Sequence, residues 1–355
     1  MSNKKLQTLA LKQYNILIGN FEVALKQVLN ATQFSRLVII TDETVYEKVY
    51  QSRAELFPEN TLVIQVPAGE QHKILDTCQI IWQALLENNI DRNALCMNLG
   101  GGVIGDMGGF CAATYKRGIR FIQAPTTLLS QVDASIGGKL AIDFSDVKNS
   151  IGVFVQPHAV LIDPEFLNTL PPRELLSGFA EIVKHAFIYD KVLWNTLKTI
   201  ETLTPQVVSE IIVPSLKVKQ VIVEQDPFER NVRKALNFGH TIGHAVESFS
   251  FSTDAPLTHG EAIAVGMLCE LELSHQLLKL PKKELIEARD YINKFYPKYS
   301  LSLDKIPEVI NFMRNDKKNV GDSIRFSLIE KIGSFKVDIA IEPILIESVL
   351  CSLLN

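Results

Sequence analysis

Three of the seven histidines in this chain lie within twenty positions, at His240, His244 and His259. His240 and His244 are four residues apart in a stretch with helical periodicity, so both imidazoles project from one helix face, about one turn apart. His259 follows a loop that contains Pro256 and begins another apolar helix. Imidazole is the commonest protein ligand for divalent metals of the zinc type. The spacing therefore predicts a metal site, against the plainer alternative that these histidines only fill a core or face solvent.

An acidic ligand is available in a second helical stretch, SGFAEIVKHAFIYD, where Lys184 and His185 follow Glu181 by one turn. Polar groups on an otherwise apolar helix are costly to bury without partners, so packing alone does not explain them. Two imidazoles and one carboxylate leave a fourth coordination position for substrate, as in catalytic zinc sites. We therefore expect a catalytic metal rather than a closed structural one.

A dense glycine run, GGGVIGDMGGF at 100–110, directly follows the apolar stretch ALCMNL. Gly100, Gly102 and Gly105 match the G-x-G-x-x-G spacing ahead of an expected helix, where backbone amides can cradle a pyrophosphate. The run predicts a dinucleotide site, and tight turns with helix caps are the alternative. It departs from the usual fingerprint because it follows a late strand and no acidic residue ends the next strand.

The ribose contact must then come from another part of the chain. Asp42 ends LVIITD, and Glu70 and Lys73 lie in PAGEQHK, so each follows a strand where an α/β sheet opens its ligand crevice.

Single basic residues on helices are usually only solvated, but their association with predicted metal ligands favours an anionic ligand. The basic candidates are Arg117, Lys139, Lys148, Lys219 and Arg233, and the other polar candidates in the same segments are Thr126, Thr127, Asp133, Asn149 and Asn237.

The elements that must position these residues change character along the chain. Short apolar runs separated by helical patterns predict an α/β fold, with a Rossmann-like parallel-sheet domain over residues 1–164. Long segments of 3.6-residue period then predict a mainly α-helical metal-binding domain over 165–355, with a hairpin at 325–341 before a last helix. The six expected strands are 14–19, 37–42, 61–66, 94–100, 119–124 and 159–163.

Composition bounds the kind of protein. The chain has 355 residues, 46% of them hydrophobic, which is enough for two domains with buried cores. A formal net charge of −4 gives no overall attraction to nucleic acid or to an anionic membrane. Five cysteines without a CxxC pair predict reduced thiols, and the sequence lacks an export signal or a run long enough to cross a membrane. We therefore expect a cytoplasmic protein that binds neither nucleic acid nor membranes.

Taken together, the sequence resembles the 3-dehydroquinate synthase family of sugar-phosphate cyclases. The resemblance extends over nearly the whole chain and rests on the segments TDETV, GEQHK, GGGVIGDMGGF, PTTLLSQVDASIGGK, GFAEIVKH, LNFGHTIGHAVE and LTHGEAIAVGM. It implies an NAD- and metal-dependent lyase of the shikimate pathway, which leads to aromatic amino acids. It also implies a homodimer that acts on a small sugar phosphate.

The resemblance further implies a role for each candidate residue. Zinc, with cobalt as the alternative, would bind Glu181, His240 and His259, and His244 would lie near the substrate phosphate, whereas spacing alone also places His244 on the metal. NAD would lie on Asp42, Glu70, Lys73, Gly101, Gly102, Asp106, Thr126, Thr127, Lys139 and Lys148. Substrate would contact Asp133, Lys139, Lys148, Asn149, Lys184, Lys219, Arg233, Asn237, the partner subunit's Arg117, and either Lys317 or Lys318.

The implied reaction converts 3-deoxy-D-arabino-heptulosonate 7-phosphate into 3-dehydroquinate and phosphate. Its steps are transient oxidation by NAD⁺, phosphate elimination, reduction and intramolecular aldol closure. One alternative is a related cyclase that acts on sedoheptulose 7-phosphate, which lacks a carboxylate; Arg233 and Asn237 argue against it. Another is a metal-dependent polyol dehydrogenase, which would release NADH. The third is a nucleotide-binding regulator without catalytic activity.

Overall fold

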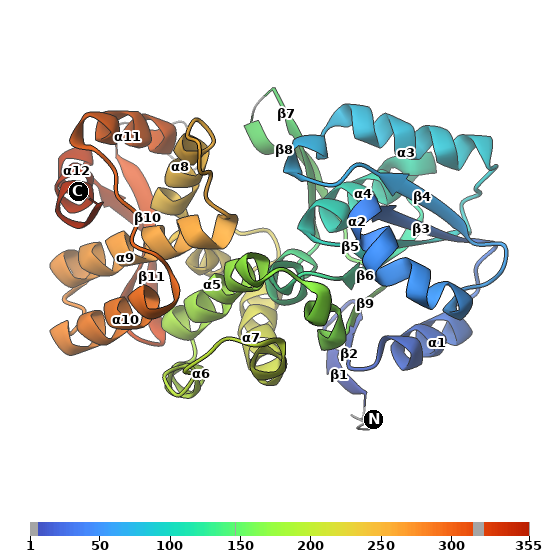
Figure 1. Ribbon diagram of the computed structural model, residues 1–355, viewed down its shortest axis with the longest axis horizontal. Coiled ribbons are helices and arrows are strands. Elements are labelled where there is room, and N and C mark those ends of the chain that lie inside the picture. Colours follow the sequence, from blue (N-terminus) through green and yellow to red (C-terminus); the bar gives the residue numbers. More distant parts are fainter. Residues whose placement is uncertain (1–5, 146, 315–322, 355) are drawn as a thin grey trace. The chain divides into compact units, whose positions relative to one another are not determined.

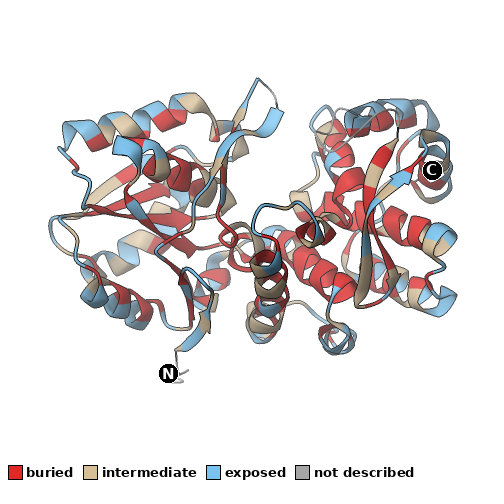
Figure 2. Ribbon diagram, turned by 180° about the vertical axis from the view of Figure 1, so that it is seen from behind, coloured by how far each residue is buried: buried red, intermediate tan, exposed pale blue. Residues whose placement is uncertain are grey.

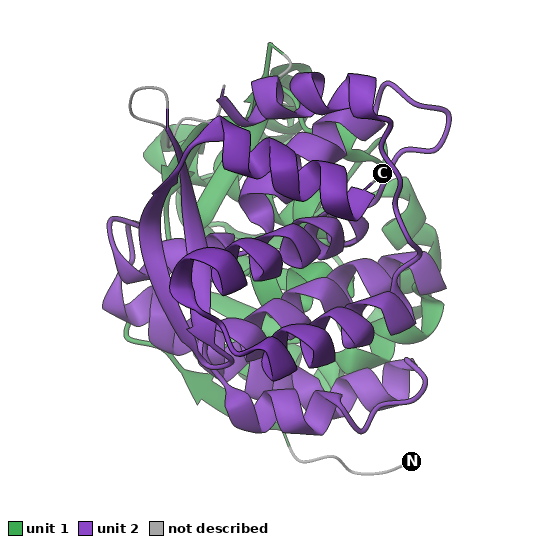
Figure 3. Ribbon diagram, turned by 90° about the vertical axis from the view of Figure 1, so that its left-hand side faces the viewer, with its two compact units in different colours: residues 1–171 green, residues 172–355 purple. Residues whose placement is uncertain are grey.

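The computed structural model describes residues 6–145, 147–314 and 323–354 (Figure 1). The chain divides into two compact units, Met1–Pro171 and Pro172–Asn355, which Figure 3 shows in different colours. Each unit has its own hydrophobic core. The sequence likewise changes character once, from strands alternating with helices to mainly helical segments.

The predicted domain boundary after residue 164 lies at the start of a short helix, η6 (Pro164–Thr169), and η6 belongs to the first unit. Lys317 and Lys318, the two candidates for a C-terminal substrate lysine, lie outside the described residues. Among the helices that are described, none is long and apolar enough to cross a membrane.

One seven-stranded sheet forms the centre of the first unit, with the order β1-β2-β9-β6-β5-β3-β4. β1 pairs antiparallel with β2, and the other neighbouring strands pair in parallel. The parallel sheet confirms the Rossmann-like prediction. The six predicted strands are β2 (Asn15–Ile18), β3 (Leu37–Asp42), β4 (Leu62–Val66), β5 (Leu95–Gly100), β6 (Arg120–Pro125) and β9 (Ala159–Ile162). Strands that were not predicted are β1 (Gln7–Ala10) and an antiparallel hairpin of β7 (Lys139–Phe144) and β8 (Val147–Phe154).

Both faces of the central strands of this sheet are buried, which explains why strands such as β3 and β5 are mainly apolar (Figure 2). Successive side chains of a strand point to opposite faces. Leu37 and Ile39 of β3 belong to the core formed with α1, whereas Val38 and Ile40 belong to the core formed with α3 and α4. The covering helices are α1 (Phe21–Ala31), α3 (Leu75–Glu87) and α4 (Gly102–Thr114).

The second unit is mainly helical, as predicted. The predicted hairpin is also present, and its strands turn at Gly333, where the φ angle is 88°. Phe326 and Leu328 of this hairpin complete a core with α8, α9, α11 and α12. The helices are α5 (Pro172–Ile188), α6 (Lys191–Leu197), α7 (Pro205–Gln225), α8 (His240–Ser250), α9 (His259–Leu278), α10 (Lys282–Phe295), α11 (Ile306–Arg314) and α12 (Pro343–Leu354), and the hairpin is β10 (Ile324–Lys331) with β11 (Ser334–Ile341).

Candidate active site

Glycines bring three helices of the second unit into close contact. A Cβ atom on Gly266 of α9 would lie 1.9 Å from the carbonyl oxygen of Gly239, the residue before α8. A Cβ atom on Gly260 would lie 2.0 Å from the carbonyl oxygen of Ser177 on α5. A side chain at either position would force the helices apart. The start of α9 therefore lies beside α5, and α9 crosses close to the start of α8.

His240 is the first residue of α8 and His259 the first residue of α9, so this crossing brings their imidazoles together. Their ring centroids are 5.5 Å apart. The ring of His244 lies 5.0 Å from that of His240 and 5.7 Å from that of His259. One nitrogen of each ring lies within 4.8 Å of the other two. The three histidines thus form one cluster, in which His240 is buried and His244 is exposed.

The Nδ1 atoms of two of these rings are already engaged. Nδ1 of His240 lies 3.1 Å from the carbonyl oxygen of Phe238, and Nδ1 of His259 lies 3.2 Å from Oε2 of Glu247. In both rings, the other nitrogen, Nε2, is directed toward Glu181. The Oε1 atom of Glu181 lies 3.5 Å from Nε2 of His240 and 3.8 Å from Nε2 of His259. A carboxylate oxygen and two imidazole nitrogens therefore converge.

Glu181 is fully buried and forms an ion pair with Lys184, which is also buried. Apart from this pair, neither carboxylate oxygen has a hydrogen-bond partner among the described residues. Zinc bonds of about 2.0–2.2 Å in a tetrahedron place neighbouring ligand atoms roughly 3.3–3.5 Å apart. The separations between Glu181 and the two histidines are close to this value, so these three residues fit a divalent metal ion.

The electrostatics of the cluster place two of these three ligands in their metal-binding forms. Burial by itself raises the pKa of Glu181, but the Lys184 ammonium and His259 outweigh it and hold that pKa well below its usual value. Burial lowers the pKa of His240 well below its usual value, and the charge of Lys184 adds to this effect. Burial also disfavours protonated His259, yet the carboxylates of Glu181 and Glu247 raise its pKa to about 9. At neutral pH, Glu181 is therefore anionic and His240 neutral, which are the forms that bind metal, whereas His259 is protonated and would release its proton when a metal binds.

The predicted substrate residues of the second unit lie on α7 and on η7 (Val232–Asn237), a short helix directly before α8. Lys219 is buried on α7, which packs against both α5 and η7. Arg233 is buried, and its backbone N–H donates to Oδ2 of Asp226 at 3.1 Å. The side-chain amide of Asn237 donates to Oε1 of Glu229 at 2.7 Å. These contacts hold the segment that leads into the histidine cluster.

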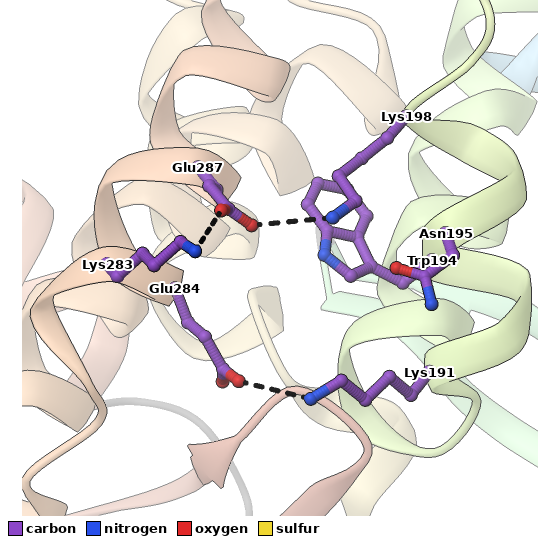
Figure 4. A pocket seen from close by; sticks show the side chains of 7 residues that line it. All are labelled: Lys191, Trp194, Asn195, Lys198, Lys283, Glu284 and Glu287. Atoms are coloured by element: carbon purple, nitrogen blue, oxygen red, sulfur yellow. Dashed lines mark hydrogen bonds and ion pairs between the residues drawn. The ribbon is translucent and has the colours of Figure 1, made fainter.

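Two hollows lie on the second unit. One of about 260 Å³ is lined by Asn237 and Thr241 together with residues of the β10–β11 hairpin, so it borders the start of α8. The other lies between α6 and α10 and is shown in Figure 4. Lys191 faces Glu284 and Lys198 faces Glu287, each at 3.5 Å, and Lys283 also faces Glu287. None of its lining residues was predicted for the site, and we assign no chemistry to it.

In the first unit, the predicted dinucleotide residues follow the carboxyl ends of neighbouring parallel strands. Asp42 ends β3, Gly101 and Gly102 follow β5, and Thr126 and Thr127 follow β6. β5 lies between β3 and β6, and the strand order reverses between β3 and β5. Such a switch point is where open α/β sheets bind their ligands. The lateness of the glycine run in the sequence therefore has a topological reason.

Not every glycine of the run serves this edge of the sheet. A Cβ atom on Gly108 would lie 2.3 Å from Oδ1 of Asn98, and one on Gly109 would lie 2.5 Å from Cδ2 of Leu140. These two glycines allow α4 to pack tightly on β5 and β7. Gly101 is the N-cap of α4, and a Cβ atom there would meet only the side chain of Thr127, at 3.1 Å or more. Packing therefore explains part of the glycine density, beside ligand approach.

The buried Lys73 contacts two other predicted residues of this unit. Nζ of Lys73 lies 2.6 Å from Oδ2 of Asp106 on α4 and 2.7 Å from Oδ1 of Asn149 on β8. Burial alone would lower the pKa of Lys73, but the charges of Asp106 and Glu70 raise it, so the ammonium is charged. Asp133 lies in η5 (Ser130–Ala134), and its carboxylate adds negative charge near Asp106. The PAGEQHK segment, α4 and the unpredicted hairpin are thereby held together.

The remaining predicted residues of this unit are exposed. Lys139 begins β7 and Lys148 lies on β8, so both belong to the hairpin. Arg117 follows α4 and lies at the end opposite to Gly102. A helix of 13 residues spans roughly 20 Å, so Arg117 is not brought to the glycine loop of its own chain.

Some buried acids with defined partners near the site were missed in the sequence. Glu247 contacts His259, and Asp226 accepts the N–H of Arg233. Glu270 on α9 accepts the N–H of Gly239 at 2.6 Å, which fixes the chain just before α8. Glu247 and Glu270 are acids within apolar segments, and Glu247 follows His240 by two helical turns, so its position on the histidine face was the available signal.

Comparisons with known proteins point to one family over both units. A family model described as the 3-dehydroquinate synthase N-terminal domain matches residues 63–177, and the model of its C-terminal domain matches 178–319. The chain is 38% identical, over 333 residues, to a 3-dehydroquinate synthase from Parabacteroides distasonis. That match covers 92% of this chain and 94% of the relative.

Solved structures share the fold. A 2-deoxy-scyllo-inosose synthase, solved with carbaglucose-6-phosphate, NAD⁺ and Co²⁺, matches with a TM-score of 0.86 at 22% identity, over 99% of this chain and 100% of that one. A 2-epi-5-epi-valiolone synthase from Streptomyces hygroscopicus, solved with NAD⁺ and Zn²⁺, matches with a TM-score of 0.83 at 24% identity, over 98% and 99% of the two chains. At these identities the likeness establishes the fold.

Proposed function

This chain belongs to the 3-dehydroquinate synthase family, and we propose that it converts 3-deoxy-D-arabino-heptulosonate 7-phosphate into 3-dehydroquinate and phosphate. The observation that carries the proposal is the convergence of Glu181 with His240 and His259 in a chain that matches the family over both units. The reaction belongs to the shikimate pathway. It uses NAD without consuming it, because the hydride taken from the substrate is returned to it.

Glu181, His240 and His259 would hold the metal, which is zinc or cobalt. When bound, the metal supplies Lewis-acid polarisation and orientation of a substrate hydroxyl. Lys184 balances the Glu181 carboxylate and can donate to an oxygen of the substrate. His244 is exposed beside the cluster, so it is placed to move a proton near the leaving phosphate.

NAD would lie at the strand-order reversal of the first unit, and when bound it supplies transient hydride acceptance. Gly101 and Gly102 permit close approach of its pyrophosphate to the start of α4. Asp42 would accept hydrogen bonds from the ribose hydroxyls. The other residues that we assign to NAD are Glu70, Lys73, Asp106, Thr126, Thr127, Lys139 and Lys148.

The substrate carries a carboxylate and a phosphate, which the net charge of the protein does not attract. Local cations must hold them, and charge-assisted hydrogen bonds suit both groups. The phosphate can itself accept the proton during its elimination. The residues that we assign to substrate are Asp133, Lys139, Lys148, Asn149, Lys184, Lys219, Arg233 and Asn237.

We further propose that the enzyme is a homodimer in the cytoplasm, with NAD bound by residues 1–164 and the metal by residues 165–355. The distance of Arg117 from the glycine loop of its own chain supports a role in trans, in which the partner subunit's Arg117 contacts substrate. The five cysteines are free, which suits a reducing compartment.

The test is a reaction of the metal-loaded protein with the heptulosonate phosphate and catalytic NAD⁺. Phosphate and dehydroquinate should form in equal amounts, without net NADH. Sedoheptulose 7-phosphate should not replace the substrate. Net NADH accumulation would instead identify a polyol dehydrogenase, turnover of the sedoheptulose phosphate a different cyclase, and NAD binding without any product a regulator.

A further inference from the structure

Glu247 has no part in the proposed function as described above. It lies on α8, two turns after His240, and is buried beside the apolar residues Val246 and Phe249. A buried carboxylate is costly unless it has a partner. Its Oε2 atom lies 3.2 Å from Nδ1 of His259, on the neighbouring helix. The position is therefore explained by the imidazole, since apolar packing alone would favour an apolar side chain.

The contact determines which nitrogen of His259 is available. With Nδ1–H donated to Glu247, Nε2 is left on the other side of the ring, where it lies 3.8 Å from Oε1 of Glu181. His240 has an equivalent arrangement, in which the partner of Nδ1 is the neutral carbonyl of Phe238. Only His259 of these two is held by a carboxylate, whose charge also increases the basicity of the far nitrogen.

We propose that Glu247 is a positioning residue, which fixes the orientation and tautomer of His259 and strengthens its bond to the divalent metal. This inference rests on the proposed metal-dependent function, but it concerns metal affinity and can be measured without substrate. Carboxylates that hold a metal-binding imidazole in this way typically contribute ~10- to 100-fold to metal affinity.

Glu247→Gln and Glu261→Gln form a matched pair of variants. Glu261 is also buried, lies on α9 two residues after His259, and pairs with Arg173 at 2.7 Å without touching an imidazole. Glu261 forms a capping box with Thr258, and glutamine can replace glutamate in that box. Both variants therefore remove one negative charge near His259 while preserving side-chain shape, and only one of them weakens the hydrogen bond to the ring.

Zinc affinity is measured by chelator competition on the metal-free proteins, after circular dichroism has confirmed their fold. Glu247→Gln should weaken zinc binding by about 10- to 100-fold and alter the visible spectrum of the Co²⁺ form, whereas Glu261→Gln should bind zinc as the unaltered protein does. Unaltered affinity in Glu247→Gln would overturn the proposal. Equal loss in both variants would also overturn it, because the effect would then be one of general charge.

A measurement on the unaltered protein decides the matter even if the variants fold poorly. In the zinc-loaded form, nitrogen NMR should show His259 protonated at Nδ1 and not at Nε2. The opposite assignment would mean that Nδ1 binds the metal and would refute the role of Glu247. The zinc affinity, the Co²⁺ spectrum and the NMR assignment do not depend on turnover. Absence of dehydroquinate formation would therefore count against the proposed function and leave this inference standing.

Discussion

The Nε2 atom of His240, the first residue of α8, lies 3.5 Å from Oε1 of Glu181, which lies in the middle of α5. The other oxygen of the same carboxylate pairs with Lys184. One buried carboxylate thus faces an ammonium on one side and two imidazoles on the other. Its single negative charge must stabilise Lys184 before any metal arrives, so Glu181 has a structural task beside the proposed catalytic one.

Glu181→Ala should therefore lose both metal and stability. The substitution removes an anionic metal ligand and leaves the Lys184 ammonium buried without its counter-charge, which typically costs about 3–5 kcal/mol. Glu181→Gln should weaken metal binding while preserving more of the fold, since the amide oxygen can still accept a hydrogen bond. Zinc content, turnover and the denaturant midpoint measure these effects.

Glu287→Ala is the control for Glu181→Ala. Glu287 pairs with Lys198 at the surface, where an ion pair contributes at most about 1 kcal/mol, so stability and zinc content should hardly change. Full zinc content and normal turnover in Glu181→Ala would remove Glu181 from the ligand set. His185 would then be the next candidate on α5, although its Nδ1 already lies 2.8 Å from Oγ of Ser215.

Lys219→Ala should reduce turnover of the heptulosonate phosphate by about ten- to a hundredfold, the value of one charge-assisted contact. The loss should be smaller with an analogue that lacks the group Lys219 faces. Lys217→Ala supplies the control, because Lys217 lies on the same helix but is exposed, whereas Lys219 is buried. Equal losses with every analogue would indicate structural damage in α7 instead of a lost contact.

The thiols give a prediction that depends on pH. Four of the five cysteines are buried and Cys351 is partly exposed, and burial raises the pKa of Cys96 to about 12. In the folded protein at pH 8, a thiol reagent should therefore label Cys351 and spare the others, while all five react in denaturant. Because the unfolded chain releases the Cys96 proton first, stability should fall as the pH rises from about 9 toward 12. Rapid labelling of all five in the native state would contradict this burial.

Local sequence patterns were sufficient for the elements with regular apolar spacing. The six strands of the parallel sheet were predicted because strands buried on both faces are short unbroken apolar runs. The β7–β8 hairpin was missed because Lys139, Lys148 and Asn149 are exposed on it, and its apolar residues do not alternate regularly. A two-stranded hairpin of this kind is stabilised by what it packs against, here α4 and Lys73, which no local pattern shows.

The candidate site was predictable in its residue types but not in its arrangement. Helical spacing placed His240 and His244 on one face, and α8 confirms this. Spacing could not show that Nδ1 of His259 is engaged by Glu247, because the two residues lie on different helices joined by a loop. The choice of ligand atoms depends on such contacts between elements, and these arise only when α5, α8 and α9 pack together.

The last prediction separates His244 from its two neighbours. One nitrogen of each of the three rings lies within 4.8 Å of the others, so proximity alone admits all three as ligands. Exposure and the direction of Nε2 distinguish them. His240 and His259 have Nδ1 held and Nε2 directed at Glu181, whereas His244 is exposed at the edge of the cluster.

His244→Ala should therefore retain zinc and bind NAD⁺, yet lose about 10²–10⁴-fold in turnover, the range expected when a positioned acid–base group is removed. His240→Ala and His259→Ala should lose zinc as well, since each removes a nitrogen that faces the Glu181 carboxylate. Zinc stoichiometry of the purified variants, NAD⁺ titration and turnover give the three readouts. If His244→Ala loses zinc as readily as the other two, the ligand set must be redrawn with His244 on the metal, and the proton transfer must be assigned to another group.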